Sequence, residues 1–295
     1  MPMLKSTDGI ELHYEDTGSG TPLVFVHEYA GDSRSWELQV RYFSRRYRCI
    51  TFNARGYPPS AVPSDPAAYS QDHAADDIAS VITGLGLGQT HVIGCSMGAF
   101  AALHLGLRRP ELCRSLVASG VGFGAAKGKE ALFHAELDHT VARIRTEGMA
   151  EMSKVYSRGP SRLIFEETDP RGYAEFVAQL GEHSTAGSAL TMAGVQRKRP
   201  SLYDLEAGFR AFTTPTLIFC GDEDDATLEP SIFLKRTIPT AGLVVLPKCG
   251  HTQNLEEPAL FNSFVMDFIT RVDAGRWPRR IPESQAKALI AAVKN

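Results

Sequence analysis

The sequence lacks two kinds of apolar segment. No run is long enough to cross a lipid bilayer, and residues 1–5 (MPMLK) contain no apolar core of a secretion signal. An excess of charge is missing too, because 31 basic and 34 acidic residues give a net charge of −3 without a basic stripe. We therefore expect a cytoplasmic protein that binds neither membranes nor nucleic acid.

Signals for metals and cofactors are also absent. The five cysteines are an odd number without a Cys-x-x-Cys pair, which argues against a zinc site or a disulfide framework and favours buried free thiols. Glycines alternate at Gly84, Gly86 and Gly88, but this segment ends a helix-like run and precedes a strand-like run, the reverse of a dinucleotide-binding loop. We expect no metal and no cofactor.

Most of the chain alternates between strand-like and helix-like patterns. Of its 295 residues, 43% are hydrophobic and 22% charged, as in ordinary globular proteins. A hairpin is predicted over residues 3–16, with Asp8-Gly9 as its turn. Strands are then expected at 23–26, 48–52, 91–94, 114–118, 215–220 and 242–246, and helices at 33–46, 70–85, 99–109, 230–237, 258–272 and 284–294. This order predicts an α/β fold with a mostly parallel sheet.

The alternation stops between residues 125 and 209. No strand is evident there, and helices are predicted at 129–147, 149–156, 173–183 and 188–196. The run Arg197-Lys198-Arg199-Pro200 has the composition of a solvated charge cluster. We therefore predict a core domain formed by residues 1–124 and 210–295, interrupted by a helical insertion of residues 125–209.

The segment that carries most chemical information is the strand that ends at Gly94. A helix-compatible run follows from Ala99, and between them lies Gly94-x-Ser96-x-Gly98, the pattern of a nucleophile elbow. Glycine at both positions lets the strand and the helix pass closely. The Ser96 hydroxyl would then lie at a helix N-terminus, where backbone N–H groups favour developing negative charge. The pentapeptide alone is common, so its strand-turn-helix context supports the prediction.

A serine nucleophile needs a base that removes its proton and an acid that orients the base. Two loops follow predicted strands at the sheet edge where Ser96 would lie. The first contains Asp222, Glu223, Asp224 and Asp225, all of which are candidate acids. The second ends at His251, the only one of nine histidines in a loop directly after the last strand, and therefore the best candidate base.

Together these segments resemble the α/β-hydrolase superfamily from about residue 3 to residue 271. The matching pieces are the His27 loop after strand 23–26, Asn53-x-Arg55-Gly56, the elbow, Gly221-x-x-Asp224 and Gly250-His251. The resemblance implies an eight-stranded sheet, and it implies that residues 125–209 form a helical cap over the site. It also implies structural roles for Asn53 and Arg55 in holding nearby loops.

The same resemblance implies a catalytic triad of Ser96, Asp224 and His251. Family members often carry the acid three residues after the glycine that closes this strand, which favours Asp224, with Asp225 as the alternative. Some family members carry the catalytic acid in the loop that follows the preceding strand, here the one predicted at 114–118. Residues 119–124 occupy that place here and contain no carboxylate.

Two backbone N–H groups are needed to stabilise the developing oxyanion. One is expected from Met97, directly after the nucleophile, and the resemblance implies Tyr29 for the other. The family pattern His-Gly-x reads His27-Glu28-Tyr29 in this chain, so a carboxylate replaces the expected glycine. Either Glu28 points away and pairs with a nearby arginine, or it meets substrate or water directly.

A site of this kind catalyses acyl transfer. We predict a serine hydrolase, carboxylesterase-like, that acts on a small carboxylic ester. Cleavage of a carbon–carbon bond in a ring-fission diketone, of a lactone or of an amide stays open, as does a receptor-like protein that only binds ligands, and a homodimer is not excluded. Five residues are candidates for lining the substrate pocket, with core packing as the alternative role: Phe123, Phe133, Met152, Tyr156 and Met192.

Overall fold

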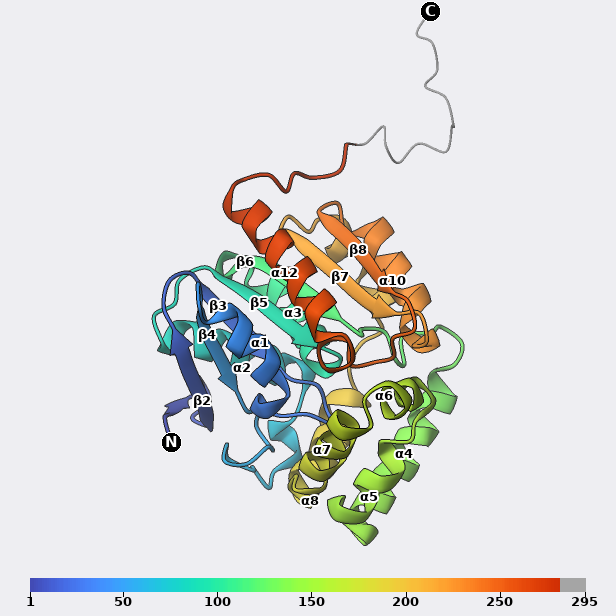
Figure 1. The fold of residues 1–295 in the computed structure, drawn as a ribbon. Helices are drawn as coiled ribbons and strands as arrows, with labels where there is room; N and C mark the ends of the chain where they lie inside the picture. The colour runs from blue at the N-terminus through green and yellow to red at the C-terminus, as the bar shows by residue number, and fades with distance from the viewer. Residues whose placement is uncertain (282–295) are drawn as a thin grey trace, which may run out of the picture.

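A mixed sheet forms the centre of the molecule (Figure 1). The computed structural model describes residues 1–281. Within them the sheet has eight strands: β1 (Met3–Lys5), β2 (Glu11–Gly18), β3 (Pro22–Val26), β4 (Arg48–Phe52), β5 (Thr90–Cys95), β6 (Cys113–Ser119), β7 (Thr216–Gly221) and β8 (Ala241–Leu246). Their order is β1-β2-β4-β3-β5-β6-β7-β8; β2 runs antiparallel to both of its neighbours, β1 and β4, and every other neighbouring pair is parallel. The predicted α/β class with a mostly parallel sheet is confirmed.

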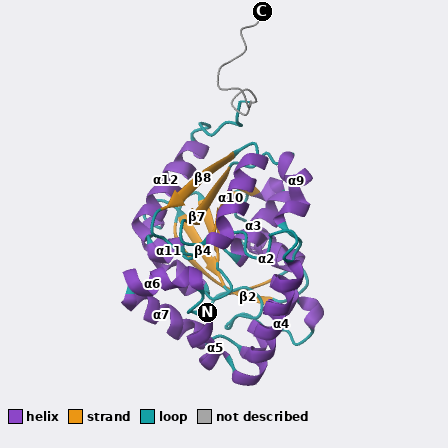
Figure 2. Ribbon diagram, turned by 90° about the vertical axis from the view of Figure 1, so that its right-hand side faces the viewer, coloured by secondary structure: helices purple, strands orange, loops and turns teal. Residues whose placement is uncertain are grey.

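Helices cover both faces of this sheet (Figure 2). The α-helices of the described residues are α1 (Glu37–Phe43), α2 (Gln71–Gly84), α3 (Met97–Arg108), α4 (Glu130–Glu147), α5 (Met149–Tyr156), α6 (Leu163–Thr168), α7 (Pro170–Gly181), α8 (Thr185–Thr191), α9 (Glu206–Arg210), α10 (Asp225–Thr237), α11 (Gln253–Glu256) and α12 (Pro258–Asp273). Short 3-10 turns are η1 (Ser33–Trp36), η2 (Pro66–Ala68), η3 (Pro110–Leu112), η4 (Pro160–Arg162) and η6 (Leu202–Leu205), and η5 (Met192–Gln196) is a π-helix. No helix within residues 1–281 combines the length and apolar character that a membrane crossing requires.

The period of two along the central strands divides their side chains between two cores. In β3, Val24 and Val26 contact a cluster that includes α2 and α3, whereas Leu23 and Phe25 contact one that includes α1 and α12. All four side chains are buried, as expected for a parallel strand covered on both faces. The sheet is therefore a rigid support, and the loops at the carboxyl ends of its strands start from fixed points.

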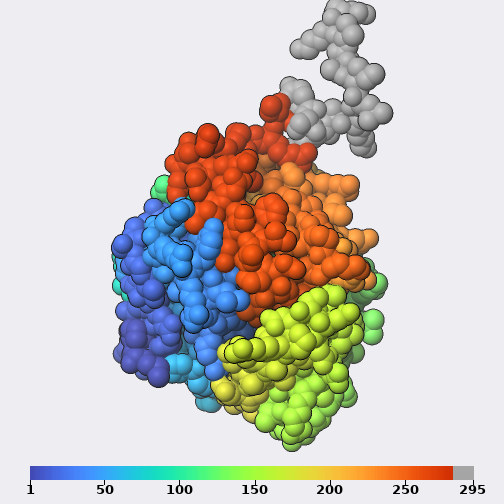
Figure 3. Space-filling view, viewed as in Figure 1, coloured from blue at the N-terminus to red at the C-terminus, as the bar shows by residue number. Residues whose placement is uncertain are grey.

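The helices from α4 to α8 lie together beyond the carboxyl ends of the strands (Figure 1). They bury a third apolar cluster, to which Phe133, Met152 and Phe176 contribute from these helices, Tyr29 from the loop after β3 and Met97 from the start of α3. In Figure 3 the yellow-green surface of these helices adjoins both the blue N-terminal part and the orange C-terminal part of the molecule. These helices are therefore packed directly over the loops that follow β3 and β5.

Most sequence-predicted elements are found close to their predicted bounds. α10 is longer than predicted, because it begins at Asp225 and accommodates Pro230 in its interior rather than beginning there. α6 and η4 were not predicted, since six and three residues are too few to show a helical period. The helix predicted for 284–294 lies outside the described residues.

Candidate active site

The strand-turn-helix at Ser96 has the strained backbone that the glycine spacing predicts. Ser96 lies between β5 and α3 with φ at 49°, and it is one of two non-glycine residues within 1–281 at positive φ. A Cβ atom on Gly98 would meet the carbonyl oxygen of Val26, and one on Gly94 would meet the backbone of Gly98. Only glycine therefore lets β5, α3 and β3 approach this closely, and Ser96 is held at the tip of the turn.

A chain of short contacts connects Ser96 to the two loops that follow β7 and β8. His251 Nε2 lies 2.9 Å from Ser96 Oγ, and His251 Nδ1 lies 2.6 Å from Asp224 Oδ2. Asp224 Oδ2 also accepts a hydrogen bond from the Thr227 hydroxyl at 2.9 Å. The three residues predicted as a triad are thus brought together in the order serine, histidine, carboxylate.

The charges and hydrogen bonds within the triad determine the protonation states of Asp224 and His251. Burial raises the pKa of Asp224, but the charge and hydrogen bond of His251 and the Thr227 hydroxyl lower it more, so the carboxylate stays ionised. Burial lowers the pKa of His251, whereas the charge and hydrogen bond of Asp224 raise it more, so that it lies above the ordinary value. The ring therefore donates Nδ1–H to Asp224 and presents Nε2 as an acceptor to the Ser96 hydroxyl.

The other three acids of the same loop make their contacts away from the His251 ring. Asp225 is exposed at the first residue of α10, and no hydrogen bond connects it to His251 in the described part of the chain. Glu223 pairs with Lys248 at 2.6 Å on the surface. Asp222 accepts a hydrogen bond from the Cys249 N–H at 3.4 Å. Geometry therefore selects Asp224 among the candidates.

Glu28, at the position of the missing glycine, forms an ion pair with an arginine of the helical insertion. Its two carboxylate oxygens lie 3.1 and 2.5 Å from the guanidinium nitrogens of Arg162 in η4, and both side chains are almost fully buried. Burial raises the pKa of Glu28, but the Arg162 charge and its hydrogen bonds lower it more, so the carboxylate is ionised. The Arg162 guanidinium also stacks on Phe176, 4.9 Å from the ring centroid.

His27 connects two loops rather than facing the cavity. Its Nε2 accepts the Ala54 N–H at 3.0 Å, so Nδ1 carries the proton and donates to the Glu28 carbonyl at 2.7 Å. Burial lowers its pKa to about 4, which keeps the ring neutral. The Tyr57 hydroxyl donates to the Tyr29 carbonyl at 2.9 Å. These bonds fix the loop whose Tyr29 N–H was predicted to face an oxyanion.

The two N–H groups predicted for the oxyanion are free of protein partners. Among the hydrogen bonds within residues 1–281, neither the Tyr29 N–H nor the Met97 N–H is a donor. Met97 is the first residue of α3, so its N–H has no acceptor inside the helix. Both residues contribute to the same buried cluster.

Asn53 and Arg55 hold the surrounding loops. The Asn53 amide accepts the Ser33 N–H at 2.9 Å and donates to the Pro58 carbonyl at 2.7 Å. Arg55 is buried and forms ion pairs with Asp77 and Asp8 at 2.6 and 2.8 Å. Neither side chain lines the cavity described below, which agrees with the structural roles expected for them.

Sequence reasoning missed two groups that position His251. Ser161, next to Arg162 in η4, accepts the His251 N–H through its carbonyl oxygen at 2.9 Å. Glu256 in α11 accepts the N–H groups of Gly250 and Thr252 at 2.5 and 2.7 Å. Backbone acceptors carry no sequence signal, but a carboxylate five residues after the histidine loop could have been considered as a local cap.

A cavity of about 490 Å³ opens above Ser96 and His251. The helical insertion supplies most of its wall, and Phe123 lies just before that insertion. All five residues that the sequence offered as pocket candidates line it: Phe123, Phe133, Met152, Tyr156 and Met192. Phe133, Met152 and Met192 are buried as well, so they also serve the core that was the alternative. No cluster of metal-ligating side chains occurs among residues 1–281.

Comparison with known proteins gives a consistent result. The sequence model of a family described as alpha/beta hydrolase fold matches residues 21–258. A 2-hydroxymuconate semialdehyde hydrolase from Pseudomonas sp. (strain CF600) is 29% identical over 273 residues, which cover 90% of this chain and 93% of that protein.

Solved structures show the same fold. The enol-lactonase from Burkholderia xenovorans LB400 superposes with a TM-score of 0.79 at 22% identity, over 91% of this chain and 100% of that chain. A thermophilic esterase from Thermogutta terrifontis superposes with a TM-score of 0.79 at 24% identity, over 92% of this chain and 99% of that chain. At these identities the likeness concerns the fold alone.

Proposed function

This chain belongs to the alpha/beta hydrolase fold family, and from that premise we propose that it is a serine hydrolase that cleaves a small carboxylic ester. The observation that carries the proposal is the hydrogen-bonded sequence Ser96–His251–Asp224 on the floor of a cavity. A neutral imidazole between a hydroxyl and an ionised carboxylate is the arrangement that activates a serine.

In this mechanism Ser96 Oγ attacks the carbonyl carbon of the ester while His251 Nε2 takes the hydroxyl proton. Asp224 stays ionised and stabilises the imidazolium that forms. The tetrahedral intermediate then expels the alcohol, which receives the proton from His251, and leaves an acyl group on Ser96. A water molecule, deprotonated by the same His251, hydrolyses this acyl-enzyme and regenerates the serine.

We assign the oxyanion to the N–H groups of Tyr29 and Met97. Each has no protein acceptor within the described residues, as a preorganised donor requires. Glu28 does not line the cavity, and its charge is balanced by Arg162, so the loop keeps its role without a glycine. We further propose that residues 125–209 act as a cap that shapes the pocket over a core of residues 1–124 and 210–295.

A second candidate is cleavage of a carbon–carbon bond in a ring-fission diketone. It is favoured by the similarity, over nine-tenths of the chain, to a protein named as a 2-hydroxymuconate semialdehyde hydrolase. Lactone hydrolysis stays open as well, because a lactone is a cyclic ester that a serine site of this kind can attack. The same serine, histidine and oxyanion donors can act on each of these carbonyls, so the geometry of the three residues does not discriminate between them.

Labelling with a serine-directed fluorophosphonate tests the enzyme proposal directly. The wild-type protein should be labelled at Ser96, and both Ser96→Ala and His251→Ala should lose the label. Absence of labelling in the wild type, or equal labelling of Ser96→Ala, would favour a ligand-binding protein without hydrolase activity.

A substrate screen then separates the bond classes. Purified protein is assayed with acyl esters, lactones and ring-fission diketones, with Ser96→Ala as the blank. We expect the highest kcat/KM for an ester, and we expect Ser96→Ala to lower kcat by about 10⁴- to 10⁶-fold. A diketone that exceeds every ester by tenfold or more would replace the ester assignment with the second candidate.

A further inference from the structure

Three arginines line the cavity above Ser96, and two of them have carboxylate partners. Arg162 pairs with Glu28, and Arg143 pairs with Glu147 at 2.7 Å. Arg199 has none, because no carboxylate of the described residues 1–281 forms an ion pair or a hydrogen bond with its guanidinium. The cavity therefore contains one arginine whose charge is not balanced by a carboxylate among the described residues.

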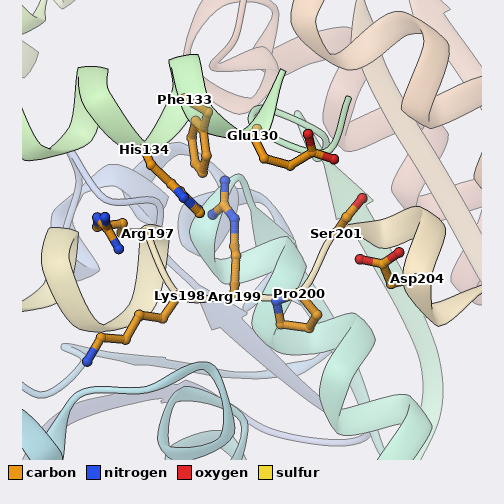
Figure 4. Close-up of a pocket in the computed structure, with 10 residues that line it drawn as sticks. Glu130, Phe133, His134, Arg197, Lys198, Arg199, Pro200, Ser201 and Asp204 are labelled. Carbon is orange, nitrogen blue, oxygen red and sulfur yellow. The ribbon is translucent and has the colours of Figure 1, made fainter. Parts of the chain in front are cut away.

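Arg199 departs from the solvated cluster that its sequence predicts. In Figure 4 its side chain rises toward Phe133 of α4, whereas Arg197 and Lys198 point away. The residues drawn in Figure 4 line an outer hollow of about 370 Å³. Arg199 lines both this outer hollow and the cavity above Ser96. Its guanidinium carbon lies 3.7 Å from the centroid of the Phe100 ring in α3. Arg199 therefore stands at the boundary between the outer hollow and the reactive serine.

The protein holds this guanidinium only with neutral groups. One Nη donates to the Phe123 carbonyl oxygen at 2.6 Å, and the other donates to the Gln196 amide oxygen at the end of η5. π-helical segments such as η5 often occur at functional sites. Arg199 is half-buried, and burial lowers its pKa to about 9, so the group is still charged at neutral pH.

Three exposed carboxylates also line the cavity without pairing with Arg199: Glu136, Asp225 and Glu223, which pairs with Lys248. A guanidinium has five N–H donors in one plane, and only two of the five are used here. The remaining donors match the two oxygens of a carboxylate, with which arginine forms short, charge-assisted hydrogen bonds.

We propose that Arg199 binds a carboxylate group of the substrate, so that the preferred substrate is an ester that carries a free carboxylate in addition to the scissile carbonyl. This substrate class rests on the ester hydrolase activity proposed above. A half-ester of a short dicarboxylic acid has the required groups and fits the volume of the cavity. The stacking on Phe100 and the bonds to Gln196 and Phe123 keep the guanidinium in place before the substrate arrives.

A pair of matched substrates tests this assignment. The mono-4-nitrophenyl ester of glutaric acid carries a carboxylate, and 4-nitrophenyl pentanoate is a neutral ester with the same five-carbon acyl chain. Wild type should give a kcat/KM at least about tenfold higher for the anionic ester. Arg199→Gln should lower kcat/KM for that ester by about 10- to 100-fold, mainly through KM, and change it less than about threefold for the neutral ester.

Arg199→Lys keeps the charge and should retain part of the preference. Arg197→Gln removes a charge two residues away, from a half-buried side chain that pairs with Asp138 and does not line the cavity above Ser96, and should leave the rates on both substrates unaffected. Equal losses on both esters in Arg199→Gln, or no preference in the wild type, would overturn the proposal, because a purely structural arginine would not discriminate by substrate charge.

A binding measurement separates this proposal from the proposed activity. Glutarate, which has no ester bond, is titrated calorimetrically into wild type and Arg199→Gln. Binding that weakens at least tenfold in the variant supports the carboxylate site even if no ester is hydrolysed. Absence of glutarate binding to the wild type, together with equal rates on the two esters, refutes the site whatever the enzyme hydrolyses.

Discussion

Replacing Glu28 with glutamine should destabilise the protein strongly, although the two side chains have nearly the same size. The side chains of Glu28 and Arg162 are 3% and 4% exposed, so the substitution leaves a buried guanidinium without its counter-charge. Removing one partner of a buried ion pair typically costs about 3–5 kcal/mol. Because Arg162 keeps its stacking on Phe176, we expect the lower value, about 3 kcal/mol.

This loss can be measured by urea and thermal unfolding at pH 7.5, followed by circular dichroism. A chain of 295 residues has an unfolding entropy of roughly 0.6 kcal/mol/K, so a loss of about 3 kcal/mol lowers Tm by about 5 °C. The double variant Glu28→Gln/Arg162→Met removes both charges and should be within about 1 kcal/mol of wild type. A loss below about 1 kcal/mol for Glu28→Gln, or additive losses in the double variant, would refute the reasoning.

Four further predictions concern the acid, the base and the turn. Asp224→Asn should lower kcat for ester hydrolysis by about 10⁴-fold, less than loss of the nucleophile, whereas Asp225→Asn should stay within about threefold of wild type; the opposite order would reassign the acid. Because His251 must be neutral to accept a proton and Asp224 holds its pKa above the ordinary value, kcat/KM should fall as pH drops through that raised pKa. Glu28→Gln should move this acidic limb to lower pH, because the Glu28 charge raises the pKa of His251 and Arg162 lowers it; an unchanged limb in the pH–rate profile would argue against this coupling. Gly98→Ala should prevent soluble expression or lower Tm by more than about 5 °C, because a methyl group there meets a backbone carbonyl that cannot move aside.

The sequence predicted the elements that local patterns determine. Parallel strands end at one edge of a sheet, so loops separated by more than a hundred residues could be placed beside Ser96 without coordinates. The family spacing after Gly221 favours Asp224 but leaves Asp225 as an alternative, because the choice depends on where α10 begins. In the structure Asp225 is the first residue of that helix and turns to solvent, which leaves Asp224 facing His251.

The contacts that the sequence could not reveal join distant segments. Arg162 is 134 residues from Glu28, and nothing local marks either residue as the partner of the other. Arg199 was grouped with Arg197 and Lys198 because three charges in four residues are typical of a surface loop. Its inward direction is fixed by its stacking on Phe100 of α3, a contact between distant segments that exists only in the assembled fold.

The bond between the Ser161 carbonyl and the His251 N–H has a mechanical consequence. Any movement of residues 125–209 that lifted η4 would break this 2.9 Å bond and the adjacent Glu28–Arg162 ion pair. It would also displace the His251 ring, which takes the proton of Ser96. The position of η4 and the alignment of His251 therefore depend on each other. A substitution in η4 that displaced the Ser161 carbonyl would therefore disturb proton transfer, although Ser161 is no member of the triad.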